Sequence, residues 1–302
     1  MKIPLQSDFF NEQVFSDPDR IVCRITPGEV IEAQLPDAMG NLLDDGDPQR
    51  GFPALRTGDD PPVGHCLLGP VAVEGARTGQ WLKIEVLRLR TTRWAWNWSQ
   101  YPHHMAGTYC YWEQTEPNRW VCVQNGWTIS AQPFLGFAGV APGRGCFSTL
   151  APHRGGGNID CPLMTEGSTL YLPLYCDDAL FYCGDCHAAQ GDGEISGTAL
   201  ECGVRELTLR MSVEPNPPFL PPPASHAPFC LSTASGKWVF FGLGSSLDEA
   251  FADAIDNGMA LIMAQTGCSQ VEARMGLSVH SRIHVTQVVN QTVGIHGIWE
   301  LL

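Results

Sequence analysis

The segment that decides how this chain is interpreted reads HRGGGNID at residues 153–160 and GSTLYLPLYCDDALFYCGDCHAAQGDGEISGTALE at residues 167–201. Acidic, amide and histidine side chains stand there among glycines and strand-forming residues. Glycine lets the backbone turn tightly and come close to a ligand, and a strand gives each side chain a fixed direction. The combination is typical of a rigid polar site held on β-structure.

Residues 180–187 within this segment are predicted to form a strand. Because side chains alternate along a strand, Asp185 and His187 are expected on one face. Such a pair can bind one divalent ion, or it can act as a base with its orienting partner. A plainer interpretation is a surface pair with no function.

Further polar residues are expected to converge on this pair. The glycine-flanked turn at 191–193 brings Glu194 back beside it, and Asn158 and Asp160 share a face just after three glycines. Asp-Gly is first of all a hairpin signal, so each piece taken singly is weak. Two glycine-flanked polar groups close together in sequence favour a functional site over simple turns.

The composition narrows the class of protein. The 302 residues carry a formal net charge of −14, and the 18 lysines and arginines form no run, which argues against a nucleic-acid partner. No segment approaches the ~20 apolar residues that span a bilayer, so no membrane partner is expected. The first residues, MKIPLQSDFFNEQVF, lack the pattern of a secretory signal, so the twelve cysteines are expected to be reduced.

The first two thirds of the chain read as short strands between Gly, Pro and Asp turns. The strands are expected at residues 30–35, 71–73, 81–89, 120–123, 169–174 and 206–213. Such spacing predicts a mainly β fold whose core is a β-sandwich or distorted barrel. Residues 94–98, WAWNW, alternate, so three tryptophans should share a face that lines a substrate pocket, forms a subunit interface or packs in the core.

A proline-rich stretch at residues 215–223 is the predicted boundary between two units. Beyond it, Ser246 with Glu249 forms a capping box that opens a helix to about residue 265, and Gly267 ends that helix. A second helix at 269–277 and a strand at 283–289 follow. We therefore expect a β-rich core with the site at 1–213 and a smaller α+β unit at 214–302, packed on the core.

The chain also resembles the acetamidase/formamidase family of amide hydrolases. The resemblance depends on motifs that occur in the family's order: GPVAVEGA at 69–76, GFAGVAP at 136–142, GGNID at 156–160, GSTLYLP at 167–173 and GDCHAAQGDGE at 184–194, with a weaker echo in IHVTQVVN at 283–290. It implies a β-rich, cytoplasmic, homo-oligomeric enzyme that hydrolyses short amides to a carboxylate and ammonia, in some members with zinc.

Site roles follow from this resemblance and from the chemistry of the residues. The predicted metal ligands are His65, Asp185 and His187. The ion is expected to be zinc, with calcium or magnesium as alternatives because oxygen ligands abound. The predicted catalytic residues are Glu194, Glu74, Asn158 and Asp160. Either glutamate could be the base, although Glu74 could instead be a buried structural carboxylate. Asn158 is expected to donate a hydrogen bond to the oxyanion. The predicted substrate contacts are Gly157, Asp192 and Trp96, and His103 with His104 could line the entrance.

The function expected is hydrolysis of a small carboxylic amide by a metal-activated water. One alternative is a different C–N bond, in a carbamate, a urea-like compound or a cyclic amide. Another is a small-ligand or metal-binding protein that has no catalytic activity. No Gly-x-Ser-x-Gly motif of a serine hydrolase occurs in the sequence.

Overall fold

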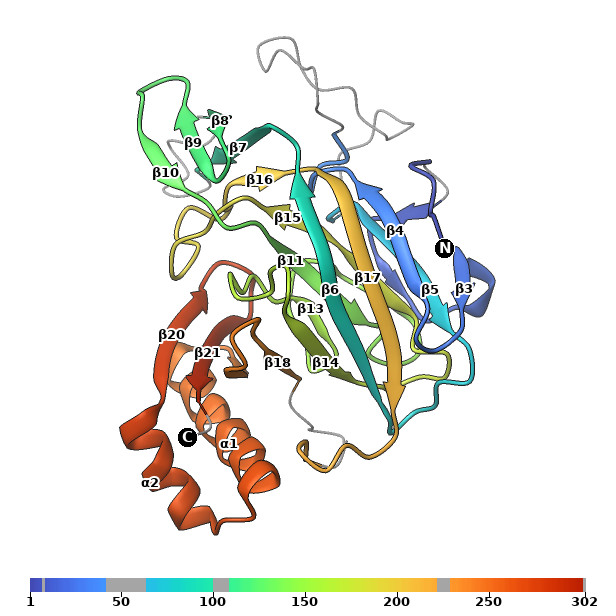
Figure 1. Cartoon of the computed structure of the whole chain (residues 1–302), viewed down its shortest axis with the longest axis vertical. Helices are drawn as coiled ribbons and strands as arrows, with labels where there is room; N and C mark the ends of the chain where they lie inside the picture. Colours follow the sequence, from blue (N-terminus) through green and yellow to red (C-terminus); the bar gives the residue numbers. More distant parts are fainter. Residues whose placement is uncertain (7–8, 42–63, 100–108, 222–228, 301–302) are drawn as a thin grey trace.

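The computed structural model describes residues 1–6, 9–41, 64–99, 109–221 and 229–300 (Figure 1). These residues form mainly β-structure, with two α-helices near the C-terminus. The predicted fold class is therefore confirmed. No helix within these ranges combines the length and the apolarity needed to cross a bilayer.

Two large sheets make up most of the structure. The first contains β1 (Phe10–Asn11), β3 (Cys23–Ile25), β5 (Leu67–Val73), β7 (Trp94–Trp98), β8 (Tyr109–Glu116), β9 (Arg119–Cys122), β10 (Thr128–Ser130), β11 (Phe134–Val140), β13 (Gly156–Asn158), β15 (Phe181–His187) and β16 (Glu201–Cys202). The second contains β4 (Val30–Leu35), β6 (Trp81–Thr91), β14 (Thr169–Pro173), β17 (Val204–Glu214), β18 (Cys230–Ser232), β19 (Trp238–Gly244), β20 (Arg282–Gln287) and β21 (Val293–Trp299). A two-stranded ribbon joins β2 (Val14–Phe15) to β12 (Cys146–Phe147), and a 3-10 turn covers Pro18–Arg20.

The main hydrophobic core contains residues of both sheets, as the sandwich prediction requires. Strand β4 shows the alternation that the sequence predicts, with Ile31, Ala33 and Leu35 buried and Glu32 exposed. By contrast, β11 and β15 are buried along their whole length. A strand that is covered on both faces keeps polar side chains away from water, so the polar residues at the end of β15 lie inside the protein.

Both C-terminal helices begin where the sequence predicts, and α1 also ends there, whereas α2 continues to His280, three residues beyond the predicted end at residue 277. Helix α1 (Leu247–Thr266) is capped by Ser246, which accepts a hydrogen bond from the Glu249 N–H, and Gly267 ends it in the left-handed conformation. Helix α2 (Gln270–His280) opens with a full capping box. Both helices bury one face in a second hydrophobic cluster with β19 and β21.

The C-terminal unit joins the rest of the chain through backbone pairing. Strand β18 pairs with β14, so the second sheet runs without a break from β4 to β20 (Figure 1). Strand β20 and the residue that follows it also contact the loop between β15 and β16 of the first sheet, because Gly193 N–H donates to Val285 O and Val288 N–H donates to Gly193 O. The boundary between two units, after residue 213, stays a prediction. The strands on either side of it belong to one continuous sheet.

Two helical glycines give a test of this packing. A Cβ at Gly258 in α1 would lie 2.9 Å from the ring of Phe240, which is fully buried, whereas a Cβ at Gly276 in α2 would make ordinary contacts of 3.6 Å with Trp299. We expect Gly258→Ala to lower the free energy of unfolding by about 1–3 kcal/mol through overpacking. Gly276→Ala should raise it by about 0.5–1 kcal/mol through helix propensity. Denaturant unfolding measures both, and equal effects of the two substitutions would contradict the close packing of α1 on β19.

Candidate active site

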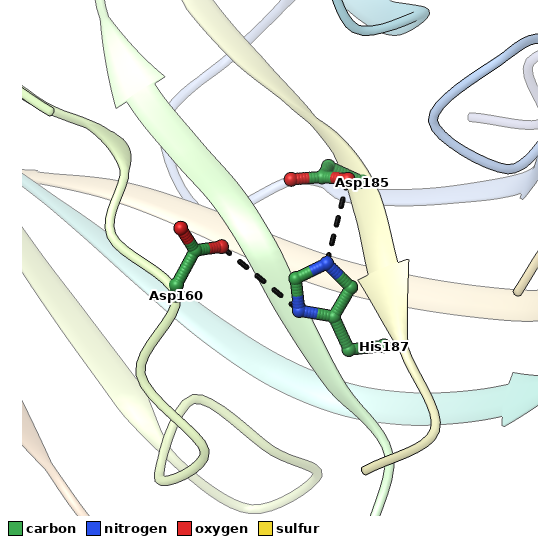
Figure 2. A group of neighbouring side chains, drawn as sticks. All are labelled: Asp160, Asp185 and His187. Atoms are coloured by element: carbon green, nitrogen blue, oxygen red, sulfur yellow. Dashed lines mark ion pairs between the residues drawn. The ribbon is translucent and has the colours of Figure 1, made fainter. Parts of the chain in front are cut away.

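Three of the predicted site residues meet at the end of β15 (Figure 2). The His187 ring lies between two carboxylates, with its Nε2 3.5 Å from Asp185 Oδ1 and its Nδ1 3.9 Å from Asp160 Oδ1. A third carboxylate, Glu201 Oε2, lies 3.2 Å from His187 Nε2. The Asp-x-His pair is therefore buried and surrounded by acidic groups, unlike a surface pair.

Sheet register explains why these groups meet. Phe134 on β11 lies opposite His187 on one side, and Glu201 on β16 lies opposite His187 on the other. Glu201 was not among the residues predicted from the sequence. Its one local signal is a charged residue that directly follows the apolar pair Ala199-Leu200.

Three carboxylate residues of the site have an unusual backbone. Asp160, Asp185 and Glu194 have φ angles of 53°, 50° and 47°, in the left-handed region that residues other than glycine rarely adopt. Such conformations cost on the order of 1–3 kcal/mol each and persist where the surrounding structure holds them. Backbone strain at three acidic residues around one histidine supports a functional role for the group.

The polar atoms of the site are buried and several have no partner. Among the described residues, Asp160 Oδ1, Glu194 Oε2 and Glu201 Oε2 make no hydrogen bond. An ionised carboxylate is costly to bury without a counter-charge. Two groups, Asp160 with Asp185 and His187, and His187 with Glu194 and Glu201, place their ligand atoms within 4.8 Å of one another. The residues therefore fit a cation.

Burial and mutual repulsion shift the protonation equilibria of the site. Burial raises the pKa of Glu194 to about 8; the charge of His187 opposes the shift, and Glu201 and Asp185 add to it. Burial also raises the pKa of Asp160. By itself burial would lower the pKa of His187, but Glu201 and Asp185 hold it well above its ordinary value. Without a bound cation, these buried side chains would take up protons, which would supply the compensating positive charge.

A cavity of about 210 Å³ lies against these groups. Its lining includes the predicted residues His65, Trp96, Asn158, Asp185, His187 and Glu194. His65 Nδ1 donates to Thr149 O at 3.2 Å, which leaves Nε2 free of that bond and fits a metal ligand. Trp96 forms one wall and its Nε1 donates to the buried Asp37 at 2.8 Å.

The amide of Asn158 is oriented differently from the predicted oxyanion donor. Its Nδ2 donates to Leu150 O at 3.1 Å, and its Oδ1 is buried with no partner in the described part of the chain. The unused atom is an acceptor, which suits a cation or a donor group of a substrate more than an oxyanion. Gly157 lies beside it in β13, with its backbone paired to Ala138 of β11.

Other predicted residues lie apart from this group. Glu74 follows the far end of β5 and is exposed, so it is neither close to His187 nor the buried structural carboxylate considered as its alternative. Asp192 is exposed and pairs with His284 at 3.0 Å, outside the cavity lining. His103 and His104 lie outside the described residues. Asn290, which was not among the predicted site residues, also lines the cavity.

Comparison with known proteins finds similarity to the same family as the motifs. The acetamidase/formamidase family model matches residues 140–217, which confirms the resemblance over that segment. A formamidase from Methylophilus methylotrophus is 32% identical over 115 residues, 34% of this chain and 25% of that protein. An acetamidase from Mycolicibacterium smegmatis is 39% identical over 59 residues, 20% of this chain and 14% of that protein. The matched segments span a quarter or less of these curated relatives.

Solved structures match nearly the whole chain. An acetamidase from Bacillus halodurans has a TM-score of 0.80 at 24% identity, covering 99% of this chain and 97% of the other. A predicted acetamidase/formamidase from Thermoanaerobacter tengcongensis has a TM-score of 0.81 at 21% identity, covering 99% and 95%. A γ-lactamase from Delftia acidovorans has a TM-score of 0.59 at 17% identity, covering 99% and 91%. The chain thus has the fold of the solved acetamidases.

Gly136 on β11 tests the close packing of the site. A Cβ there would lie 2.5 Å from Asp185 O, 2.7 Å from the His187 ring and 2.9 Å from Asp160 Oδ1. We expect Gly136→Ala to displace His187 and to weaken the binding of a divalent ion added to the protein, measured by calorimetry, by roughly 10- to 100-fold, as for loss of a supporting residue.

The matched control is Gly191→Ala. A Cβ at Gly191 meets no atom within 4 Å and the residue has no left-handed φ, so the affinity for the added ion should stay unchanged. Equal affinity of Gly136→Ala and the parent protein for that ion would show that the side chains around His187 tolerate the added methyl group.

Proposed function

We propose that this protein hydrolyses a small carboxylic amide to a carboxylate and ammonia. The observation that carries the proposal is the buried group of Asp160, Asp185, His187, Glu194 and Glu201 beside a cavity, all within the segment that matches the acetamidase/formamidase family. The names of the curated relatives, formamidase and acetamidase, support the same reaction class. An amide is unreactive because resonance weakens its carbonyl, so its hydrolysis requires electrostatic help and proton transfer.

We also propose a divalent ion, with zinc first and calcium or magnesium as alternatives. His65, Asp185 and His187 would hold it, since all three line one cavity, and Asp160 and Glu201 are close enough to add oxygen ligands. When bound, the ion supplies positive charge that polarises the carbonyl and acidifies water. Two histidines favour zinc, while the surplus of carboxylates keeps the harder ions open.

Glu194 is the proposed base. Its Oε2 is buried without a partner among the described residues, and the side chain lines the cavity, so it can take a proton from the attacking water and pass it to the leaving nitrogen. Trp96 and Trp98 cover one wall and exclude bulk water. Glu74 has no part in this proposal, because it is exposed beyond the far end of β5.

A different C–N bond is the nearest alternative. The structural similarity to a protein named γ-lactamase makes a cyclic amide a reasonable second substrate class. A binding protein without catalytic activity would keep the ion but release no ammonia. We further propose that the protein is cytoplasmic, as the resemblance implies.

Ammonia release from a panel of amides tests the function. Formamide, acetamide, larger primary amides, a carbamate, urea and a γ-lactam should be compared, with elemental analysis of protein purified without added metal. We expect turnover of a linear primary amide and close to one equivalent of zinc. Asp185→Asn and His187→Ala should each lower kcat/KM by roughly 100-fold or more, since both act in the site.

The control is Asp256→Asn, an exposed carboxylate on α1. It should retain the activity and the metal content of the parent protein. Full activity with less than a tenth of an equivalent of any metal would refute the metal mechanism, and a bound metal with no turnover of any panel member would favour the binding protein.

We propose that the protein forms a homo-oligomer, because exposed apolar residues lie on the surface of α2. Val271, Met275 and Val279 follow one another at every fourth position, each at least 65% exposed, so they form an apolar stripe on one helix face. A second copy of the chain would cover such a stripe. Light scattering at micromolar concentration should give a dimer or larger assembly. Replacing the three residues by serine should yield monomers, whereas Val123→Ser, at an exposed residue just after β9, should not.

A further inference from the structure

Asn290 is a cavity residue that comes from the C-terminal unit. It lies just after β20, in the loop between β20 and β21, and shares the cavity with Asp185, His187 and Glu194. Its Nδ2 donates a 2.6 Å hydrogen bond to Asp160 Oδ2. Asn290 is therefore joined directly to the acidic group, from an element far away in sequence.

A buried glutamine fixes this loop. Gln287 is fully buried, and its Oε1 accepts hydrogen bonds from the backbone N–H groups of Val289 and Asn290, both at 3.0 Å. Its Nε2 donates to Thr292 O at 2.6 Å. Gln287 thus holds both sides of the loop, and the position of Asn290 does not depend on a substrate.

The hydrogen bond to Asp160 fixes which way the Asn290 amide faces. Because Nδ2 donates to Asp160 Oδ2, Oδ1 occupies the other branch of the amide. Within the described ranges Oδ1 has no hydrogen bond. The result is a neutral acceptor, with a fixed orientation, at the wall of the cavity.

A neutral acceptor in this place has a specific use in amide hydrolysis. A primary amide offers two N–H donors on its leaving nitrogen, an N-alkyl amide offers one and an ester offers none. The other buried acceptors near the cavity are carboxylates, which carry charge and can bind a cation, and the amide oxygen of Asn158, which is neutral. Asn290 Oδ1 can therefore accept a donor without adding charge to an already acidic site.

We propose that Asn290 is a specificity-determining residue that accepts a hydrogen bond from the NH₂ group of the substrate. The substrate class is then primary carboxamides with an unsubstituted nitrogen. This proposal rests on the proposed amide hydrolysis. An ester has no N–H group. When it binds, Asn290 Oδ1 would give up its hydrogen bond to water and receive none from the ester, and a polar site rejects an analogue for this reason.

The test compares substrates that share one acyl group: propionamide, N-methylpropionamide and methyl propionate. We expect Asn290→Ala to lower kcat/KM for propionamide by roughly 10- to 100-fold more than for methyl propionate, the effect of one buried hydrogen bond. The ratio of the two substrates matters, because loss of the bond to Asp160 affects both alike. Asn216→Ala, on an exposed loop, is the matched control and should leave the ratio unchanged.

Two outcomes would overturn the proposal. An equal loss for amide and ester would mean that Asn290 acts only by positioning Asp160, and an unchanged preference for propionamide over N-methylpropionamide in Asn290→Ala would mean that the nitrogen is recognised elsewhere. The proposed function itself fails only if the parent protein hydrolyses no amide of the panel described above. Without turnover, calorimetry makes the same comparison. The affinities of the parent protein and of Asn290→Ala for propionamide and for methyl propionate are measured, and an equal loss of affinity for both compounds would contradict the proposal.

Discussion

Burial of one histidine among several carboxylates is the constraint on which the site depends. His187 lies within 4 Å of Asp160, Asp185 and Glu201, and all four residues are removed from water. Charges in such a place repel one another strongly and lose their hydration, so they persist only when something compensates them. A cation is the simplest compensation, and proton uptake by the acidic side chains is the other.

The surrounding structure is built to keep this group in place. Gly136 leaves room for the His187 ring and for Asp160, because any larger residue at that position would overlap both. Asp160, Asp185 and Glu194 have left-handed backbone conformations, and their side chains lie around His187. Neighbouring strands β11 and β16 then hold β15 on both edges, so strain at Asp185 cannot relax by moving the strand.

The C-terminal unit contributes to the site and does more than extend a sheet. Its loop supplies Asn290 to Asp160, and Gln190 Nε2 bridges Asp160 O and Thr286 O at 2.9 Å and 3.1 Å. The acidic group is therefore held from both sides, by the sandwich and by the α+β unit. This explains why the motif at residues 283–290 accompanies those of the core, since it carries the residues that complete the cavity.

Local sequence determined much of this protein. Capping chemistry predicted both ends of α1 and the start of α2, and runs of β-branched and apolar residues between turn residues predicted β4, β6 and β17, because these signals act over a few neighbouring residues. Spacing alone put Asp185 beside His187. Only the tertiary structure decided that Glu201 and Asn290 belong to the site and that Glu74 does not. Strand register and the return of the C-terminal loop bring residues together from 14 and 103 positions away from His187, and no periodicity in a single sequence reports contacts of that range.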